Sequence, residues 1–203
     1  MHVSTVAPEI FSVGIQGEVG SFNEVAVLSY LERTNTQDYH IEYLSTTERV
    51  LAAVVAGKVY RGQFAVHNSL GSVVNESAEA LAHYDEGTFT TVAEYDLLIA
   101  HAFMTHPDAE YADIKTIMTH PQVLAQCRST LAQKYPHLIQ VVGESLLIDP
   151  ATVARELGHG RLSPSIAVLG NRRLAELNNL VVLEDNLQDN AENYTTFRLV
   201  KIK

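Results

Sequence analysis

The feature that most constrains the fold is a repeated order in which an apolar strand precedes a helix. Phe11–Ile15 has the composition of a short buried strand that contains Gly14, and two further glycines, Gly17 and Gly20, separate it from an apolar periodic run that begins at Phe22. Ser21 and Glu24 have capping-box spacing, which predicts that a helix starts here. Its free N–H groups offer an anion site, but the glycine spacing departs from the dinucleotide fingerprint and a plain turn explains it better.

The same order recurs along the next segment of the chain. Tyr39–Leu44 is a second predicted strand, and a second capping-box pair, Ser45 and Glu48, predicts a helix over 46–56. Gln63–Val66 is a third strand, followed by a helix predicted over 73–83. Repeated strand and helix units of this kind predict an α/β fold.

Polar residues lie between the third strand and its helix. Asn68, Ser69 and Ser72 occupy the carboxyl end of a strand, which is a common ligand position in α/β sheets. The alternative is local: Ser72 caps the helix and Asn68 stabilises the turn. Both interpretations stay open on this evidence.

The second half of the chain begins with two extended segments in 89–104 and continues with a strand over Lys115–Thr119. His120-Pro121 then opens a helix that is predicted to run through Leu131, with proline at its first position. Cys127 lies on the apolar side of this helix, which predicts burial and not reactivity. His101 and His106 are five residues apart across extended chain, which points them to opposite faces, and no cysteine or carboxylate completes a ligand set, so no metal site is predicted.

The composition of the chain limits the kinds of molecule that it is expected to bind. The chain has 203 residues, 46% of them hydrophobic, and a net charge of -10, which argues against a nucleic-acid surface. It has one cysteine, no apolar run of membrane-spanning length and no signal-peptide pattern at the start. These observations predict a cytoplasmic protein without nucleic-acid or membrane partners.

A polar and aromatic run, 188–197, leads into an apolar strand over Phe197–Ile202. A strand so late in such a chain is expected to pair with much earlier elements and to bring its polar residues to a cleft. Thr195 is the first candidate for chemistry on this ground.

The segment 112–127, with the run His120-Pro121-Gln122, resembles the catalytic domain of the prephenate dehydratases, a family that includes the arogenate enzymes. Further matches occur in the same order: Gln16-Gly17, Gly20 with Glu24, Asn68-Ser69, Gly71-Ser72-Val73, Asn75-Glu76, Ile166-Ala167, Gln188-Asp189, Asn193, and Thr195 with Phe197.

The resemblance implies a two-lobed α/β domain, similar to type II periplasmic binding proteins, with the substrate in a cleft between the lobes. Residues 1–92 with 188–203 are expected to form one lobe and 93–187 the other. The chain stops at Lys203, so no C-terminal phenylalanine-sensing regulatory domain is expected. A homodimer or larger homo-oligomer is expected from the same resemblance.

The implied reaction converts prephenate to phenylpyruvate with loss of carbon dioxide and water, and requires neither a metal nor a cofactor. Thr195 matches the family threonine that acts on the leaving hydroxyl. The candidate catalytic residues are Thr195 and His67. The candidate substrate-binding residues are Gly20, Ser21, Asn68, Ser69, Gly71, Ser72, Gln188, Thr196, Phe197 and Arg198.

Four positions depart from the family pattern. His67 replaces a glutamate, Thr196 an arginine, Pro150 a threonine and Val168 a serine. Arg198 lies two residues beyond Thr196 and either supplies the missing charge or points to solvent. His67 either donates to the substrate or only packs locally.

These departures keep other functions open. One alternative is a prephenate decarboxylase of a natural-product pathway, which retains the ring hydroxyl and does not form an aromatic ring. A further alternative is a non-catalytic homologue that binds a small molecule.

Overall fold

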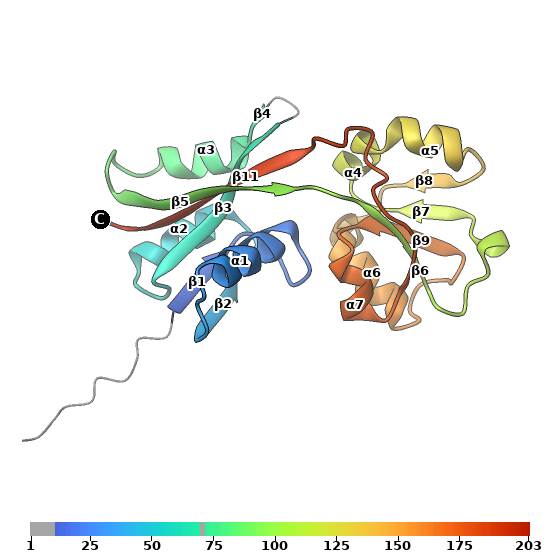
Figure 1. The fold of residues 1–203 in the computed structure, drawn as a ribbon, viewed down its shortest axis with the longest axis horizontal. Coiled ribbons are helices and arrows are strands. Elements are labelled where there is room, and N and C mark those ends of the chain that lie inside the picture. Colours follow the sequence, from blue (N-terminus) through green and yellow to red (C-terminus); the bar gives the residue numbers. More distant parts are fainter. Residues whose placement is uncertain (1–10, 70–71) are drawn as a thin grey trace, which may run out of the picture. The chain divides into compact units, whose positions relative to one another are not determined.

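The computed structural model describes residues 11–69 and 72–203, and these fall into two compact units, each built on one β-sheet (Figure 1). The first unit takes in the described residues of Met1–Val19 and Asn23–Leu97 together with Thr195–Lys203. The second takes in Gly20–Phe22 and Leu98–Tyr194. The predicted lobe boundaries, at 92/93 and 187/188, fall a few residues before the corresponding divisions. The predicted α/β class is confirmed.

The first unit has a sheet in the order β2-β1-β3-β11-β5, with β4 paired to β3. Strands β1, β2 and β3 are parallel, whereas β11 is antiparallel to β3. Its elements are β1 (Phe11–Ile15), α1 (Phe22–Arg33), β2 (Tyr39–Tyr43), α2 (Thr47–Val55), β3 (Arg61–Asn68), β4 (Ser72–Val73), α3 (Asn75–Ala82), β5 (Phe89–Leu98) and β11 (Tyr194–Ile202).

The helix starts in this unit differ from two of the predicted caps. Thr46, not Ser45, caps α2, and its side chain accepts from the Arg49 N–H at 3.3 Å. Ser45 adopts a φ of 62° and donates instead to Glu18 Oε1 at 2.6 Å. The prediction that Ser72 caps the third helix is wrong, because Ser72 belongs to strand β4 and the helix begins at Asn75.

The second unit has a sheet in the order β10-β6-β9-β7-β8. Strands β7, β8 and β9 are parallel, and β6 is antiparallel to both β9 and β10. Its elements are β6 (Ala102–Thr105), the 3-10 turn η1 (Tyr111–Asp113), β7 (Thr116–Met118), α4 (Pro121–Gln126), α5 (Arg128–Lys134), β8 (Ile139–Val141), η2 (Ser145–Ile148), α6 (Pro150–Gly158), β9 (Ile166–Gly170), α7 (Arg173–Asn178) and β10 (Val181–Glu184).

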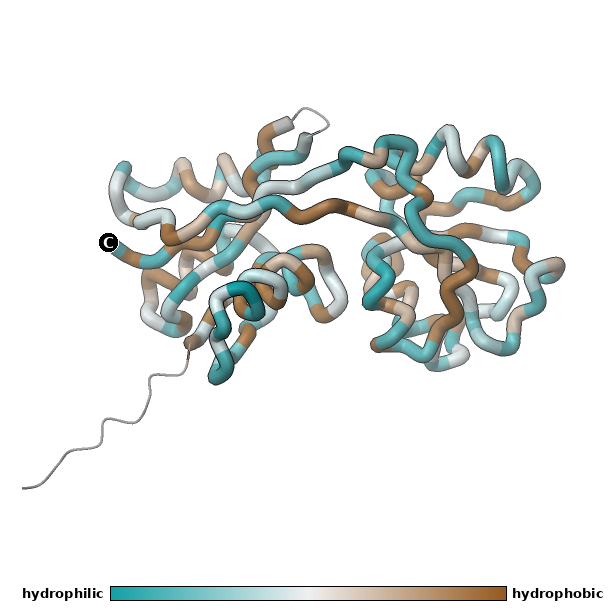
Figure 2. The backbone as a smooth tube through the Cα atoms, viewed as in Figure 1, coloured by the Kyte–Doolittle hydropathy of each residue, from teal (hydrophilic) through white to brown (hydrophobic). Residues whose placement is uncertain are grey.

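Two apolar clusters cover the faces of this second sheet. Phe103, Ile117 and Leu169 centre one of them, and Met104, Val168 and Leu157 the other. The alternation along β6 and β9 sends neighbouring residues to opposite clusters, as the period of a strand requires. The brown stretches of Figure 2 follow strands such as β6, whereas the connecting loops are mostly teal.

Proline and its preceding residue define two helix starts here, of which the one at His120-Pro121 was predicted. His120 caps α4 and Asp149 caps α6, with proline as the first helical residue of each. The helix predicted to run to Leu131 is instead two helices, α4 and α5, divided at Cys127. Cys127 is fully buried, as predicted.

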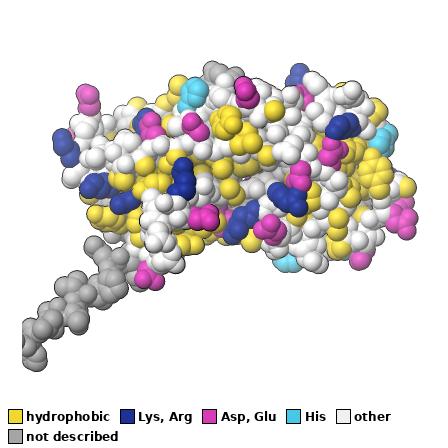
Figure 3. Space-filling view, viewed as in Figure 1, with side chains coloured by type: hydrophobic (Ala, Val, Ile, Leu, Met, Phe, Trp, Pro, Cys, Tyr) yellow, Lys and Arg dark blue, Asp and Glu magenta, His cyan; other side chains and the backbone are white. Residues whose placement is uncertain are grey.

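None of the helices within residues 11–69 and 72–203 has the length and apolar character needed to span a bilayer. On the face drawn in Figure 3, acidic, basic and hydrophobic side chains are interspersed.

Candidate active site

Thr195 and Asn68 meet in the first unit where β11 begins and β3 ends. The two residues are paired in the antiparallel register, and Asn68 Nδ2 donates to Thr195 Oγ1 at 2.9 Å. Both side chains are half-buried. Because the Thr195 oxygen accepts this bond, its hydroxyl proton is left to donate elsewhere. A hydroxyl held in this way suits donation to an oxygen of a ligand.

The neighbouring strand residues face the other way. His67 pairs with Thr196, and successive residues of a strand point to opposite faces of a sheet. His67 and Thr196 therefore lie on the face opposite to Asn68 and Thr195. Thr196 Oγ1 donates to Asp96 Oδ1 on β5 at 2.6 Å, whereas His67 is exposed. The structure thus joins one predicted catalytic residue, Thr195, to Asn68 and separates the other, His67, from both.

Arg198 shares the face of Thr196, as the alternation predicts. Its Nε donates to Glu94 Oε1 at 2.6 Å, and its side chain is 33% exposed. The guanidinium is thus neither free for a carboxylate nor simply solvated. Phe197 is 1% exposed and packs in the core, so its side chain has almost no surface to offer a ligand.

The other predicted substrate-binding residues near Asn68 lie in or next to the turn between β3 and β4. Ser69 is exposed in the turn after β3, and Ser72 lies opposite Asn68 in the β3–β4 register. The predicted site residue Gly71 lies outside the described residues.

Gln16 and Glu76, which both match the family pattern, have structural roles within the same unit. Gln16 Nε2 donates to Glu76 Oε2 at 2.8 Å, and the Thr47 N–H donates to Glu76 Oε1 at 3.0 Å. The Ala65 N–H in turn donates to Gln16 Oε1 at 3.3 Å. Glu76 therefore places a carboxylate at the N-terminus of α2, where the helix dipole favours it.

Gln188 belongs to a buried polar network in the second unit. Its Oε1 accepts from the His101 N–H at 3.0 Å, and it is only 8% exposed. His101 Nε2 bonds Gln126 Oε1 at 2.6 Å, which requires the proton to be on Nε2. Burial lowers the pKa of His101, with the Gln126 hydrogen bond opposing it, and so favours the neutral imidazole. Gln126 lies in the family-like segment 112–127, but no sequence pattern singled it out.

A pocket of about 180 Å³ lies within the second unit. Gly20 and Ser21, both predicted site residues, form part of its wall. The full lining is Gly20, Ser21, Phe22, His120, Val123, Asp149, Pro150, Ala151, Gly170, Asn171 and Leu174. This set combines four segments that are far apart in sequence, at the starts of α1, α4 and α6 and at the carboxyl end of β9. Such a position is typical of ligand sites in α/β sheets.

Gly20 is fixed by its backbone and by its neighbours. Its φ is 85°, and a Cβ there would overlap Leu174 Cδ2 and lie 3.2 Å from Leu177 Cδ1. The loop therefore needs glycine both for its conformation and for its close approach to α7.

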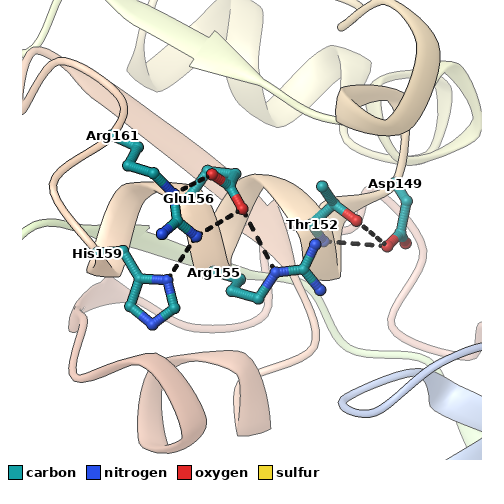
Figure 4. A network of polar contacts seen from close by, with 6 residues as sticks. All are labelled: Asp149, Thr152, Arg155, Glu156, His159 and Arg161. Carbon is teal, nitrogen blue, oxygen red and sulfur yellow. Dashed lines mark hydrogen bonds and ion pairs between the residues drawn. The ribbon is translucent and has the colours of Figure 1, made fainter.

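Helix α6 presents its first residues to the pocket and is held by a polar network (Figure 4). Asp149 Oδ2 accepts from the Thr152 N–H at 3.0 Å and from its hydroxyl at 3.1 Å. Farther along, Glu156 bonds both Arg161 and Arg155, and the Arg161 hydrogen bond is the main reason that its pKa falls to about 2. The two arginines of this network are thus engaged by Glu156, and neither lines the pocket.

Sequence reasoning missed Asn171 as a pocket residue. The available signal was its position directly after the apolar strand that ends at Gly170 and shortly before a helix. Val168, a departure from the family pattern, is fully buried in β9, whereas Pro150, another departure, lines the pocket.

Comparison with known proteins supports the expected family. The family profile described as prephenate dehydratase matches residues 13–203. The bifunctional chorismate mutase/prephenate dehydratase of Escherichia coli is 25% identical over 201 residues, covering 97% of this chain and 48% of that protein. Arogenate dehydratase/prephenate dehydratase 2 of Arabidopsis thaliana is 25% identical over 188 residues, covering 93% of this chain and 45% of that protein.

Solved structures share the fold. The prephenate dehydratase of Arthrobacter aurescens in complex with L-Phe has a TM-score of 0.81 at 24% identity, over 95% of this chain and 60% of that one. GqqA, described as a quorum quenching acylase, has a TM-score of 0.72 at 23% identity, over 95% of this chain and 64% of that one.

The chain spans about half the length of the curated relatives it matches. Its match to the family profile covers most of the sequence, from 13 to 203, and agrees with the motifs around His120, Asn68 and Thr195. The chain therefore belongs to the prephenate dehydratase family.

Proposed function

We propose that this chain is a lyase that converts prephenate to phenylpyruvate with loss of carbon dioxide and water, as a step of aromatic amino-acid biosynthesis. Family membership supports the reaction class. The single observation that carries the assignment of residues is the hydrogen bond from Asn68 Nδ2 to Thr195 Oγ1, at 2.9 Å. It orients a hydroxyl donor at the start of β11, which the reaction requires.

The reaction requires the protein to position the substrate and to supply one proton donor. The electron pair of the departing carboxylate's C–C bond enters the ring, and the C–O bond of the ring hydroxyl breaks as the ring becomes aromatic. The Thr195 hydroxyl donates to this leaving oxygen, which departs as water after gaining a proton. A proton from solvent restores the threonine. Formation of the aromatic ring supplies most of the driving force.

We further propose that the pocket of the second unit binds part of the substrate. Its wall contains Gly20 and Ser21, and it has predominantly apolar walls with a few polar groups, as small-molecule sites generally do. A homo-oligomeric state remains part of the proposal and is tested by light scattering on the purified chain.

One departure in this pocket favours a second candidate function. Pro150 lines the pocket at a position where the family has a hydroxyl-bearing threonine. Loss of that hydroxyl alters the groups that meet the substrate and supports a decarboxylase that adds a proton to a ring carbon and retains the ring hydroxyl.

Product identification after incubation with prephenate near neutral pH tests the proposal. Phenylpyruvate supports the dehydratase, and a non-aromatic keto acid that retains its hydroxyl supports the decarboxylase. Binding without turnover points to a binding protein and overturns both enzymatic proposals. Arogenate, tested in parallel, establishes which of the two related substrates has the larger kcat/KM.

The role of Thr195 has a matched control in the next residue. We expect Thr195→Val to lower kcat by roughly 10²–10⁴-fold, the contribution typical of a positioned proton donor, with substrate binding largely intact. Thr196→Val removes only the hydroxyl that bonds Asp96 on the opposite face, and is expected to retain kcat within about threefold, since an exposed bond contributes little. Equal rates for the two variants would remove Thr195 from the mechanism.

A further inference from the structure

Asn171 has a buried side-chain amide whose oxygen has a local hydrogen-bond partner and whose nitrogen does not. It follows the last residue of β9, is 9% exposed, and accepts from the Arg173 N–H through Oδ1 at 3.0 Å. Only the oxygen of the amide accepts a hydrogen bond, so this contact fixes which end is Nδ2. Nδ2 is buried and has no acceptor among the described residues. An aspartate would make the same turn bond without burying an unpaired donor.

The residues around Asn171 indicate what kind of hydrogen-bond acceptor a ligand would offer to Nδ2. Asn171 lines the 180 Å³ pocket together with apolar residues that include Phe22, Val123 and Leu174. Among the described residues that line the pocket there is no lysine or arginine, and the carboxylate of Asp149 is held by Thr152. Asp149 already places a carboxylate at the start of α6, so a carboxylate ligand there would meet a like charge without a lysine or arginine in the wall to offset it. The pocket suits an uncharged oxygen carried on an apolar frame.

His120 gives the same wall a second donor. Its Nδ1 accepts from the Gln122 N–H at 3.1 Å, so in the neutral ring the proton is on Nε2. The pocket volume is also close to that of an apolar cavity that holds a benzene ring, on the order of 150 Å³. Donors on an apolar wall and a volume for one six-membered ring define the class of ligand.

We propose that Asn171 determines specificity in this pocket: its side-chain amide donates a hydrogen bond to an uncharged oxygen, hydroxyl or keto, of a ligand that carries a six-membered ring. The inference rests on the proposed function to the extent that this ligand is the substrate. The amide assignment itself rests only on the geometry of the second unit.

A pair of probes of similar shape tests the amide without requiring turnover. The full chain, labelled with ¹⁵N at asparagine side chains, is titrated with cyclohexanone and with methylcyclohexane. The NH₂ signals that are missing in Asn171→Leu identify this residue. We expect them to shift with cyclohexanone and to move much less with methylcyclohexane.

The variants separate a ligand contact from a structural role. Asn171→Asp retains the acceptor for the Arg173 N–H but loses the donor, and Asn171→Leu loses both. Each is expected to weaken cyclohexanone binding about 2- to 12-fold, the range for one neutral hydrogen bond, and to leave methylcyclohexane binding of the leucine variant unchanged or stronger. Asn190→Leu, at an exposed asparagine of the second unit, is the control and should bind both probes as the parent does.

Turnover then distinguishes this inference from the proposed function. If the parent chain converts prephenate, Asn171→Asp should raise KM with little change in kcat. Turnover with unchanged KM and unchanged cyclohexanone binding in both variants overturns the role of Asn171. If the parent chain does not convert prephenate, the proposed function fails, and the probe titration still decides whether Asn171 is a ligand donor.

Discussion

Replacing Gly20 with alanine tests whether the loop at the pocket is fixed by contact as well as by conformation. Gly20 has a φ of 85°, and a Cβ there would overlap Leu174 Cδ2. A left-handed conformation costs an alanine about 1–2 kcal/mol, and pushing a leucine away from its rotamer costs about 0.5–1.5 kcal/mol. Loss of glycine's freedom in the unfolded chain returns about 0.4–1 kcal/mol. We expect a net loss of about 0.5–3 kcal/mol for Gly20→Ala.

Gly160→Ala is the matched control. Gly160 also has a positive φ, 66°, but apart from its neighbours in the chain no atom of the described residues lies within 4 Å of its would-be Cβ. Gly160→Ala should therefore lose stability only through the left-handed backbone conformation. The difference between the two variants should be about 0.5–1.5 kcal/mol, the part that arises from Leu174.

Urea unfolding measures this difference, and hydrogen exchange of the β9 amides assigns it to the second unit. A double variant with Leu174→Ala removes the overlapping side chain, so the two substitutions should be less than additive by about the same 0.5–1.5 kcal/mol. If Gly20→Ala and Gly160→Ala cost the same, or if the double variant is additive, the contact between the loop and α7 does not restrain Gly20.

Two other predictions concern single side chains. Burial, with the charge of Asp189 adding to its effect, raises the pKa of the Cys127 thiol to about 12. An alkylating reagent at about pH 8 should therefore label Cys127 only after the protein unfolds. Rapid labelling of the folded chain would contradict this prediction. Because the folded-state pKa lies above that of an exposed thiol, this contribution to stability is complete below about pH 8.5 and declines as the pH rises further. Arg198→Gln should change KM for prephenate by less than about threefold, because the Arg198 guanidinium is already bonded to Glu94. A rise in KM of about tenfold or more would indicate that Arg198 binds the substrate.

Local sequence signals located the elements but not all of their ends. His120-Pro121 and Asp149-Pro150 were sound helix starts because the cap and the proline act within one turn. Ser45 failed as a cap because it takes a positive φ and bonds Glu18, 27 residues away in sequence. Ser72 failed because pairing with β3 took its backbone into a strand. In both cases a longer-range contact overrode the local pattern.

The site shows the same limit. The pairing of Thr195 with Asn68 was anticipated from a family likeness, since the two residues are 127 positions apart and no local pattern connects them. Asn171 was not anticipated, because its unpaired amide is defined by a pocket that four separate segments complete. The opposite orientation of Thr195 and Thr196 followed directly from the alternation of a strand.

The position of β11 in the first sheet has a consequence for how the chain is made. This strand lies between β3 and β5, yet it leaves the ribosome after the whole second unit. The first unit therefore cannot complete its sheet during synthesis of residues 11–193, whereas the second unit is almost continuous in sequence and can fold beforehand. Until β11 arrives, the facing edges of β3 and β5 remain unpaired and open to association with other chains. We expect chaperone demand and aggregation to be greatest in this interval, and a stalled chain that ends before Tyr194 to show both.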